Sequence, residues 1–222
     1  MQYDPSSRSR LSSHDLPRFT GDTLFDRIAR ALCGAGCLPR KEFFEAWEVA
    51  RRVRRRFRGG RVVDLACGHA LLGQLMLLLD DTSPSAVCVD RRIPKSARLV
   101  ADTLAAEWPR LASRIELVEG DVESVALGPT DVVVSAHACG ALSDVILARA
   151  VSVAARVAVL PCCHATAKCD TGHLEGWLDP ALAIDVTRAA TLTTRGYRVY
   201  TQRIPETITP KNRLLLAAPA SR

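Results

Sequence analysis

The 222-residue chain is long enough for one domain with a sizeable core, because 48% of its residues are hydrophobic. Its apolar runs stop short of the ~18–20 residues that a membrane-spanning helix needs, and its first residues lack the apolar core of a secretory signal. The formal net charge of +6 originates in residues 1–61, which carry 14 Lys and Arg against 7 Asp and Glu. Eight cysteines without an export signal indicate a reducing compartment, and we expect a cytoplasmic protein.

The amino-terminal quarter contains three segments of different character. Residues 1–19 are rich in Ser and Arg and predict a disordered tail. Apolar residues recur with helical spacing over 20–34 and 40–58, and Gly34, Gly36 and Pro39 separate the two stretches. We therefore expect an amino-terminal helical unit over residues 20–59.

The second of these helices ends in a basic run, Arg51–Arg58. Such a run can contact the phosphates of a nucleic acid, which makes RNA a candidate partner. It is equally typical of a solvated helix end, because cations are favoured near the negative pole of the helix dipole. Both interpretations remain open from the sequence.

From residue 60 onward, short β-branched runs alternate with helical stretches, and this alternation predicts a mostly parallel sheet with helices on both faces. The expected strands cover 61–66, 85–90, 114–119, 131–136, 156–161, 196–204 and 212–217, and the expected helices cover 70–80, 93–107, 141–152 and 179–194. No helix separates the last two strands, so we expect them to pair antiparallel. Residues 60–222 therefore predict an α/β, Rossmann-like domain with the seven-stranded sheet of class I methyltransferases.

The first expected strand ends in a turn of small residues that contains Asp64, Ala66 and Gly68. Ligands of open α/β sheets bind beyond the carboxyl ends of the strands, where small residues let the backbone approach the ligand. The helix that follows directs its amino terminus toward an anionic group such as a carboxylate. Asp64 is positioned to pair with an ammonium group of the same ligand.

The second and third expected strands also end in acidic residues. Asp90 closes the second and can accept hydrogen bonds from ribose hydroxyls, while Asp121 and Val122 follow the third and can bind an adenine ring. Three acidic positions at the ends of successive strands predict an S-adenosylmethionine (SAM) site, with a nicotinamide dinucleotide or another α/β ligand as the alternatives.

Two histidines follow the fourth and fifth strands, where an acceptor would meet the cofactor. His137 and His164 are the candidate bases for an acceptor that carries a proton. Asp144 lies about one helical turn beyond the fourth strand and is the candidate to orient one of them. For His137 the competing interpretation is a residue that caps the following helix.

Cys162 and Cys163 admit three interpretations. They can be small packing residues beneath the substrate pocket, or metal ligands together with His137, Cys139 or His164. In the third, Cys162 is a covalent nucleophile. Cys169 with His173, and Cys33 with Cys37, are further pairs with metal-ligand spacing. We expect packing, assign no metal ligand, and keep Cys162 as a candidate catalytic residue.

The segments HACGALSD at 137–144 and LPCCH at 160–164 resemble a methyltransferase family that includes tRNA acceptor-stem 2′-O-methyltransferases and glutathione S-transferase C-terminal-domain-containing proteins. The resemblance covers roughly residues 60–170. It implies a class I fold and SAM as cofactor, and it favours RNA as acceptor.

We therefore expect a SAM-dependent methyltransferase that acts on a nitrogen or oxygen acceptor, with RNA favoured. The alternatives are methyl transfer to a small molecule or a protein side chain, and a non-catalytic module of the same fold that binds RNA or a partner.

Overall fold

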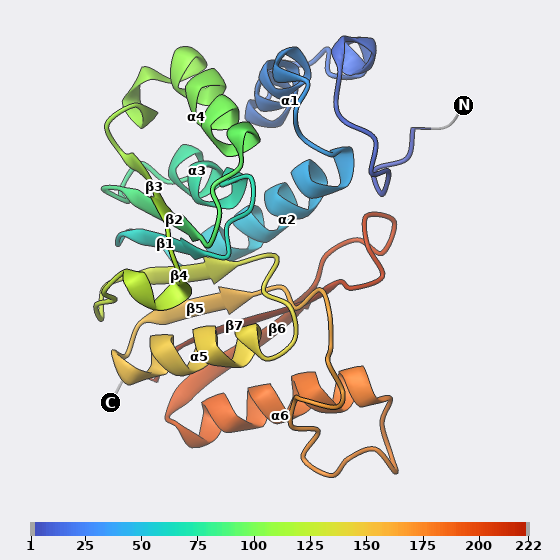
Figure 1. The fold of residues 1–222 in the computed structure, drawn as a ribbon, viewed down its shortest axis with the longest axis vertical. Coiled ribbons are helices and arrows are strands. Elements are labelled where there is room, and N and C mark those ends of the chain that lie inside the picture. The colour runs from blue at the N-terminus through green and yellow to red at the C-terminus, as the bar shows by residue number, and fades with distance from the viewer. Residues whose placement is uncertain (1–2, 221–222) are drawn as a thin grey trace.

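The computed structural model describes residues 3–220 and contains one seven-stranded sheet of order β3-β2-β1-β4-β5-β7-β6 (Figure 1). Strands β1 to β5 are parallel where they pair, and β7 runs antiparallel to both β5 and β6. The strands are β1 Val62–Leu65, β2 Ala86–Asp90, β3 Ile115–Glu119, β4 Val132–Ser135, β5 Arg156–Val159, β6 Tyr197–Arg203 and β7 Arg213–Pro219. The predicted fold class and the antiparallel last pair are confirmed.

Six α-helices accompany the sheet in the described chain. They are α1 Leu24–Ala35, α2 Arg40–Arg56, α3 Leu71–Leu78, α4 Lys95–Glu107, α5 Leu142–Ser152 and α6 Pro180–Thr194. Each lies where the apolar spacing predicted a helix. Over the described residues, no helix is both long enough and apolar enough to cross a bilayer.

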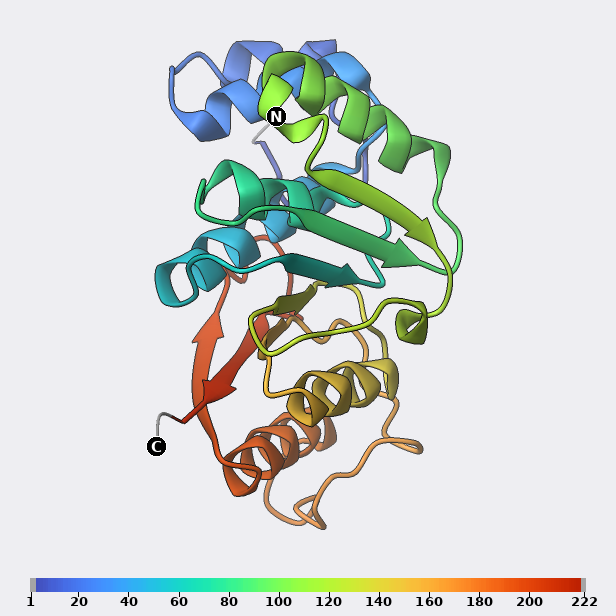
Figure 2. The ribbon, with the colours of Figure 1, turned by 90° about the vertical axis from the view of Figure 1, so that its left-hand side faces the viewer.

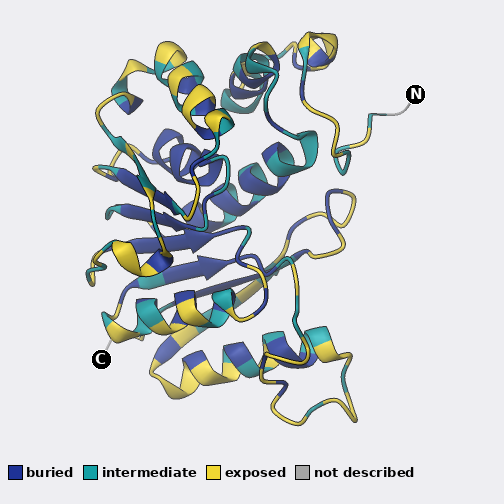
Figure 3. Cartoon of the chain, in the orientation of Figure 1, coloured by how far each residue is buried: buried dark blue, intermediate teal, exposed yellow. Residues whose placement is uncertain are grey.

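Successive side chains of the central strands point to opposite faces of the sheet, and each face carries its own hydrophobic core. Val62 and Val132 belong to the larger core, which contains buried residues of α1 to α4. Their neighbours Val63 and Val133 face the opposite way and share the second core with α5 and α6. Because successive strand residues point to opposite faces, buried strands with helices on both sides are apolar at nearly every position. Figures 2 and 3 show the two helix layers and the buried strands between them.

The predicted disordered tail is wrong for residues 3–19. A 3-10 helix, Ser13–Arg18, follows a bridge between Arg10 and Pro39. Leu11 is fully buried and Phe19 nearly so, and both join the larger core. The burial of these two apolar side chains orders the segment although most of its residues are polar. The segment covers apolar surface that α1 and α2 would otherwise expose to water. The prediction for residues 1–2 lies outside the described residues.

One arginine of the basic run at the end of α2 is internal to the fold. Arg54 is 2% exposed and binds the Asp80 carboxylate at 3.2 Å, the Ser83 hydroxyl at 2.7 Å and the Met76 carbonyl at 2.9 Å. Burial lowers the pKa of Arg54 to about 10, although Asp80 acts in the opposite direction. Arg54 is therefore excluded as an RNA contact.

The rest of the run is paired or lies far from the strand ends that bind ligands. Arg51 and Arg52 form ion pairs with Glu48, whereas Arg55, Arg56 and Arg58 are exposed. Because α2 ends just before β1 begins, these three side chains lie at the amino edge of the parallel strands. Contact between RNA and the basic run stays a prediction, and within the run only the exposed arginines are accessible for it.

Replacement of Arg54 by Ala should lower the free energy of unfolding by about 3–5 kcal/mol, because the buried Asp80 then loses its nearer and buried cation and keeps only the exposed Arg58 at 3.8 Å. Urea denaturation followed by circular dichroism measures the change. The matched control is Arg55→Ala, at an exposed position one residue further along the helix, which should change stability by no more than about 0.5 kcal/mol. Equal effects of the two substitutions would contradict the structural role of Arg54.

Candidate active site

The turn after β1 has an unusual backbone that side-chain and main-chain hydrogen bonds hold in place. Ala66, Gly68 and Ala70 have φ angles of 56°, 54° and 54°, in the left-handed region. That region costs an alanine roughly 1–2 kcal/mol. The Gly68 N–H donates to Asp90 Oδ2 at 2.9 Å, and the Ala70 N–H donates to the Cys67 carbonyl at 2.8 Å. Strain of this kind is typical of segments that bind ligands.

Asp64 is a buried carboxylate at the end of β1, with 1% of its surface exposed. Its Oδ2 accepts a hydrogen bond from the Gly73 N–H at 3.0 Å, and a methyl group at Gly73 would lie 2.7 Å from Cys88 Sγ. Glycine at this position therefore lets α3 approach β1 and β2 closely. Burial raises the pKa of Asp64 to about 7. The hydrogen bond from Gly73 lowers this pKa, and the negative charge of Asp90 raises it further by a smaller amount. A carboxylate in this environment is prepared to pair with a cation.

A cavity of about 460 Å³ opens beyond the ends of β1 to β4. Four predicted cofactor residues line it, namely Ala66, Asp90, Asp121 and Val122. Val122 is buried and gives the cavity an apolar wall, whereas Asp121 is exposed and pairs with Arg91 at 2.6 Å. Because both partners of that ion pair are well exposed, it contributes little stability and can open for a ligand.

A small neighbouring cavity of about 10 Å³ contains Asp64 and His137, so the structure brings the predicted carboxylate and one predicted base together. Glu42 and His69 also line this cavity, and the sequence analysis missed both in this role. His69 Nδ1 lies 2.7 Å from Ser96 Oγ, and its Nε2 lies 3.3 Å from Glu42 Oε2. Glu42 is on α2, and the helical spacing that predicted α2 carried no sign that its first turn reaches the end of β1.

The expected pairing of Asp144 with a histidine is wrong. Asp144 binds Arg188 on α6, with Nε–Oδ1 and Nη2–Oδ2 distances of 2.6 and 2.9 Å. His164 instead forms a bond of 2.8 Å from Nε2 to Asp185, which is also on α6. The His164 side chain is 3% exposed. Asp144 and His164 are thus held in ion pairs and hydrogen bonds within the fold, and His137 is the candidate base that a cavity reaches.

The Asp185 carboxylate is bound by two side chains from other elements, His164 and Arg213. His164 and Arg213 hold its pKa below the usual value although burial acts in the opposite direction. Arg213 binds Asp185 Oδ2 at 2.6 Å. The loop after β5, the start of β7 and α6 are therefore joined through one carboxylate.

The predicted nucleophile Cys162 lies beside a second thiol, with its Sγ 2.9 Å from Cys139 Sγ. Burial and the neighbouring thiols raise the pKa of Cys162. Because the thiolate is the nucleophilic form, this environment disfavours a covalent role for the free residue. Cys169 lies next to Arg188, and Cys33 is buried within α1.

The sequence matches the model of a methyltransferase-domain family over residues 42–170. The chain belongs to this family. The matched region extends from α2 to the loop after β5 and so contains the turn after β1, the cofactor cavity and Cys139, Cys162 and Cys163. No curated protein matches the sequence significantly.

Solved structures share the fold. An O-methyltransferase family protein from Burkholderia thailandensis is 19% identical with a TM-score of 0.54, over 93% of this chain and 63% of its own. The mitomycin 7-O-methyltransferase is 20% identical with a TM-score of 0.53, over 94% and 63%. A Pyrococcus horikoshii protein, provisionally assigned as an RNA methyltransferase, is 16% identical with a TM-score of 0.50, over 82% and 86%. The chain therefore spans less than two thirds of the first two proteins.

The family implies SAM as cofactor, and the residues at the strand ends fit it. SAM carries an ammonium, a ribose and an adenine, and the structure offers Asp64, Asp90 and Asp121 in that order along successive strands. The buried, partly satisfied Asp64 carboxylate and the cavity beside it are the observations that support this fit. When bound, SAM supplies an electrophilic methyl group on a sulfonium.

The affinity for SAM should rise from about pH 5.5 to 7, because Asp64 must lose its proton before it pairs with an ammonium group. Binding near pH 6 should release a proton, which calorimetry in two buffers of different ionisation enthalpy detects. Asp64→Asn should bind more weakly and without this pH dependence. A parent protein whose affinity stays constant over this range would contradict the assignment.

Asp90→Ala should abolish measurable SAM binding, because it removes both an acceptor for the ribose hydroxyls and the anchor of the Gly68 N–H. Isothermal titration measures the affinity. Asp102→Ala, at an exposed position on α4, is the matched control and should bind as the parent does. Unchanged affinity in Asp90→Ala would show that the ribose lies elsewhere.

Proposed function

We propose that the protein transfers the methyl group of SAM to a nitrogen or oxygen atom of RNA. Family membership and the carboxylates along one cavity support the cofactor. The resemblance of residues 137–144 and 160–164 to the family of the tRNA acceptor-stem 2′-O-methyltransferases supports RNA. The solved relatives include enzymes of small molecules as well as RNA, so the fold itself favours neither acceptor.

The distribution of cations at the cofactor edge carries the preference for RNA. Arg92 and Lys95 follow β2 and are exposed, and Lys211 is exposed in the loop between β6 and β7. Because β7 runs antiparallel to β5, this loop lies at the same edge as the carboxyl ends of β1 to β5. Exposed cations around a catalytic cavity attract a polyanion such as RNA.

The chemistry requires an acceptor lone pair aligned with the methyl group, and a base where the acceptor carries a proton. His137 is the side chain that we propose as this base. It is half-buried, follows β4 and lines the small cavity beside Asp64. His164, Asp185, Asp144 and Arg188 act as positioning residues that hold the loops after β4 and β5.

Transfer of labelled methyl from SAM to fractionated RNA, protein and metabolites of the source cell tests the acceptor. We expect label in the RNA fraction, lost on ribonuclease treatment. His137→Ala should lower turnover by about 10²–10⁴-fold while SAM affinity stays within a few-fold. His14→Ala, at an exposed position in the amino-terminal 3-10 helix, is the matched control and should keep parent activity.

Each contrary outcome identifies one of the other functions. Label in protein or metabolites alone would replace RNA by that acceptor class. Tight SAM binding without transfer to any fraction would favour a non-catalytic binding module. Equal loss of turnover in both histidine variants would remove His137 as the base.

A further inference from the structure

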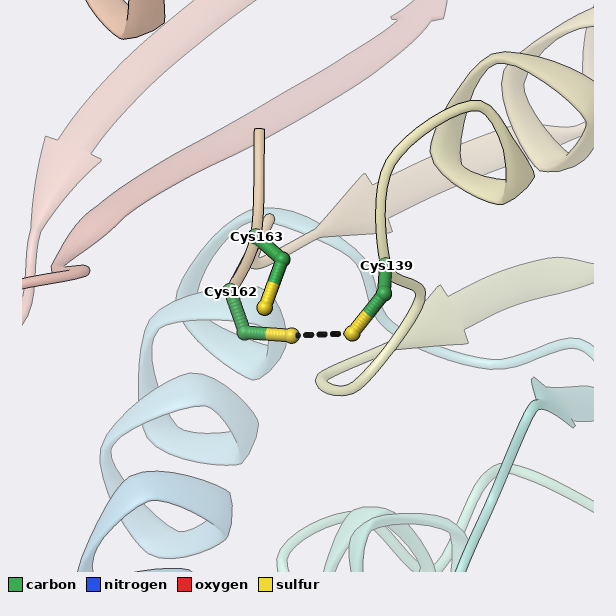
Figure 4. Close-up of side chains that lie close together, drawn as sticks. All are labelled: Cys139, Cys162 and Cys163. Atoms are coloured by element: carbon green, nitrogen blue, oxygen red, sulfur yellow. Dashed lines mark hydrogen bonds between the residues drawn. The ribbon is translucent and has the colours of Figure 1, made fainter. Parts of the chain in front are cut away.

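Three cysteine thiols converge at the edge of the cofactor cavity. Cys139 follows β4, and Cys162 and Cys163 follow β5 (Figure 4). Their sulfur atoms all lie within 4.8 Å of one another, and the closest pair is Cys139 and Cys162 at 2.9 Å. In the described chain, no other group of three or more Cys, His, Asp or Glu side chains has this geometry.

The sheet builds this convergence. Ser135 in β4 is level with Val159 in β5, and the Leu160 N–H extends the pairing by donating to the Ser135 carbonyl at 2.9 Å. Continued at the same offset, the register places Cys139 level with Cys163. The two loops are thus brought together by the strands that precede them.

Hydrogen bonds then hold the two loops beyond the strands. The Gly140 N–H donates to the Cys163 carbonyl at 2.9 Å, and Arg188 Nη2 donates to the Gly140 carbonyl at 3.0 Å. Gly140 has a φ of 56°, which favours glycine. Both backbone polar groups of the residue after Cys139 are therefore used to fix this loop, and the thiols are prearranged.

Packing does not explain these thiols. Cys33, Cys67 and Cys88 are buried and behave as small apolar residues, which is the role that the packing interpretation gave to Cys162 and Cys163. By contrast, Cys139 and Cys163 are exposed and Cys162 is half-buried. Exposed thiols that point toward one another fill no core, so their arrangement calls for a ligand.

We propose that Cys139, Cys162 and Cys163 bind one Zn²⁺ ion through their thiolates. Tetrahedral zinc with Zn–S bonds of about 2.3 Å places its sulfurs about 3.8 Å apart. All three sulfurs lie within 4.8 Å of one another, and the Cys139–Cys162 pair must separate by about 1 Å to reach this spacing. Soft thiolate ligands favour zinc over the hard cations Mg²⁺ and Ca²⁺.

The fourth coordination position of this zinc is open to a water molecule or an acceptor atom. Among the described residues, only three ligating side chains belong to the cluster. Three protein ligands with a free position are typical of catalytic zinc sites rather than structural ones. Cys139 lines the same cavity as Asp90 and Asp121, so the open position adjoins the cofactor site. Zinc binding itself does not rest on the proposed RNA acceptor.

The metal content of the full-length protein, purified without an affinity tag after growth with zinc, tests the proposal. Elemental analysis by inductively coupled plasma mass spectrometry should find about one zinc ion per chain. Cys139→Ser and Cys163→Ser should each reduce the zinc content to below about a tenth of the parent value. Cys37→Ser, at a half-buried cysteine outside the cluster, is the matched control and should retain zinc.

Cobalt gives a second readout that identifies the ligands. Co²⁺ added to the metal-free parent should produce the sulfur-to-cobalt charge-transfer absorption of thiolate ligands, and this absorption should fall in each cluster variant. Thermal unfolding and SAM affinity of the same variants report on the fold. If Cys139→Ser fails to fold, the exposed Cys163→Ser and the cobalt spectrum of the parent still decide the question.

Three results would overturn the proposal. The first is a folded parent that stays metal-free after incubation with zinc, with the exposed Cys139 and Cys163 both reactive toward a thiol reagent. The second is copper in place of zinc. The third is a disulfide between Cys139 and Cys162 in protein purified without reductant, which would make the pair a redox site. SAM binding is measured separately, so failure of the zinc site leaves the methyltransferase proposal standing.

Discussion

The parallel register of β2, β1, β4 and β5 is the constraint on which the rest of the site depends. Parallel pairing brings the carboxyl ends of these strands to one edge, and each strand delivers its functional residue there within a few positions of its end. Asp90 and Cys139 line the cofactor cavity, and Asp64 and His137 line the small cavity beside it. A slip of one residue would reverse every inward side chain, and the two opposed cores prevent such a slip.

Helix α6 completes the edge from outside the sheet. Arg188 binds Asp144 and the Gly140 carbonyl, and Asp185 binds His164 and Arg213. Both charged residues of α6 thus act on loops that follow strands, and the loops owe their positions to a helix that comes later in the chain. Their partial burial makes these charge pairs sensitive to loss of either partner. The loops after β4 and β5 are therefore held by side chains that do not line the cofactor cavity.

The sequence predicted those features that a local pattern determines. It did not predict features that depend on contacts between residues far apart in the chain. Alternation and spacing predicted every strand and every α-helix of the described chain, and the acidic residues at strand ends predicted part of the cavity lining. The partners of Asp144 and His164 were not predictable, because both lie on α6 and no spacing links α6 to β4 or β5. The order of residues 3–19 was missed for the same reason, since Leu11 and Phe19 find their cover on α1 and α2.

The carboxylates and the thiols at this edge of the sheet have related electrostatic effects. SAM brings a sulfonium and an ammonium, and the carboxylates of Asp64, Asp90 and Asp121 give this edge a negative field in which we propose that Asp64 pairs with the ammonium. A zinc ion with three thiolates has a formal charge of −1, which would add to this negative field and attract the cofactor further. The same field would repel a phosphate backbone inside the cavity, whereas the exposed cations Arg92, Lys95 and Lys211 lie outside its lining. An RNA acceptor would then be held at the rim while only its reacting base or ribose enters.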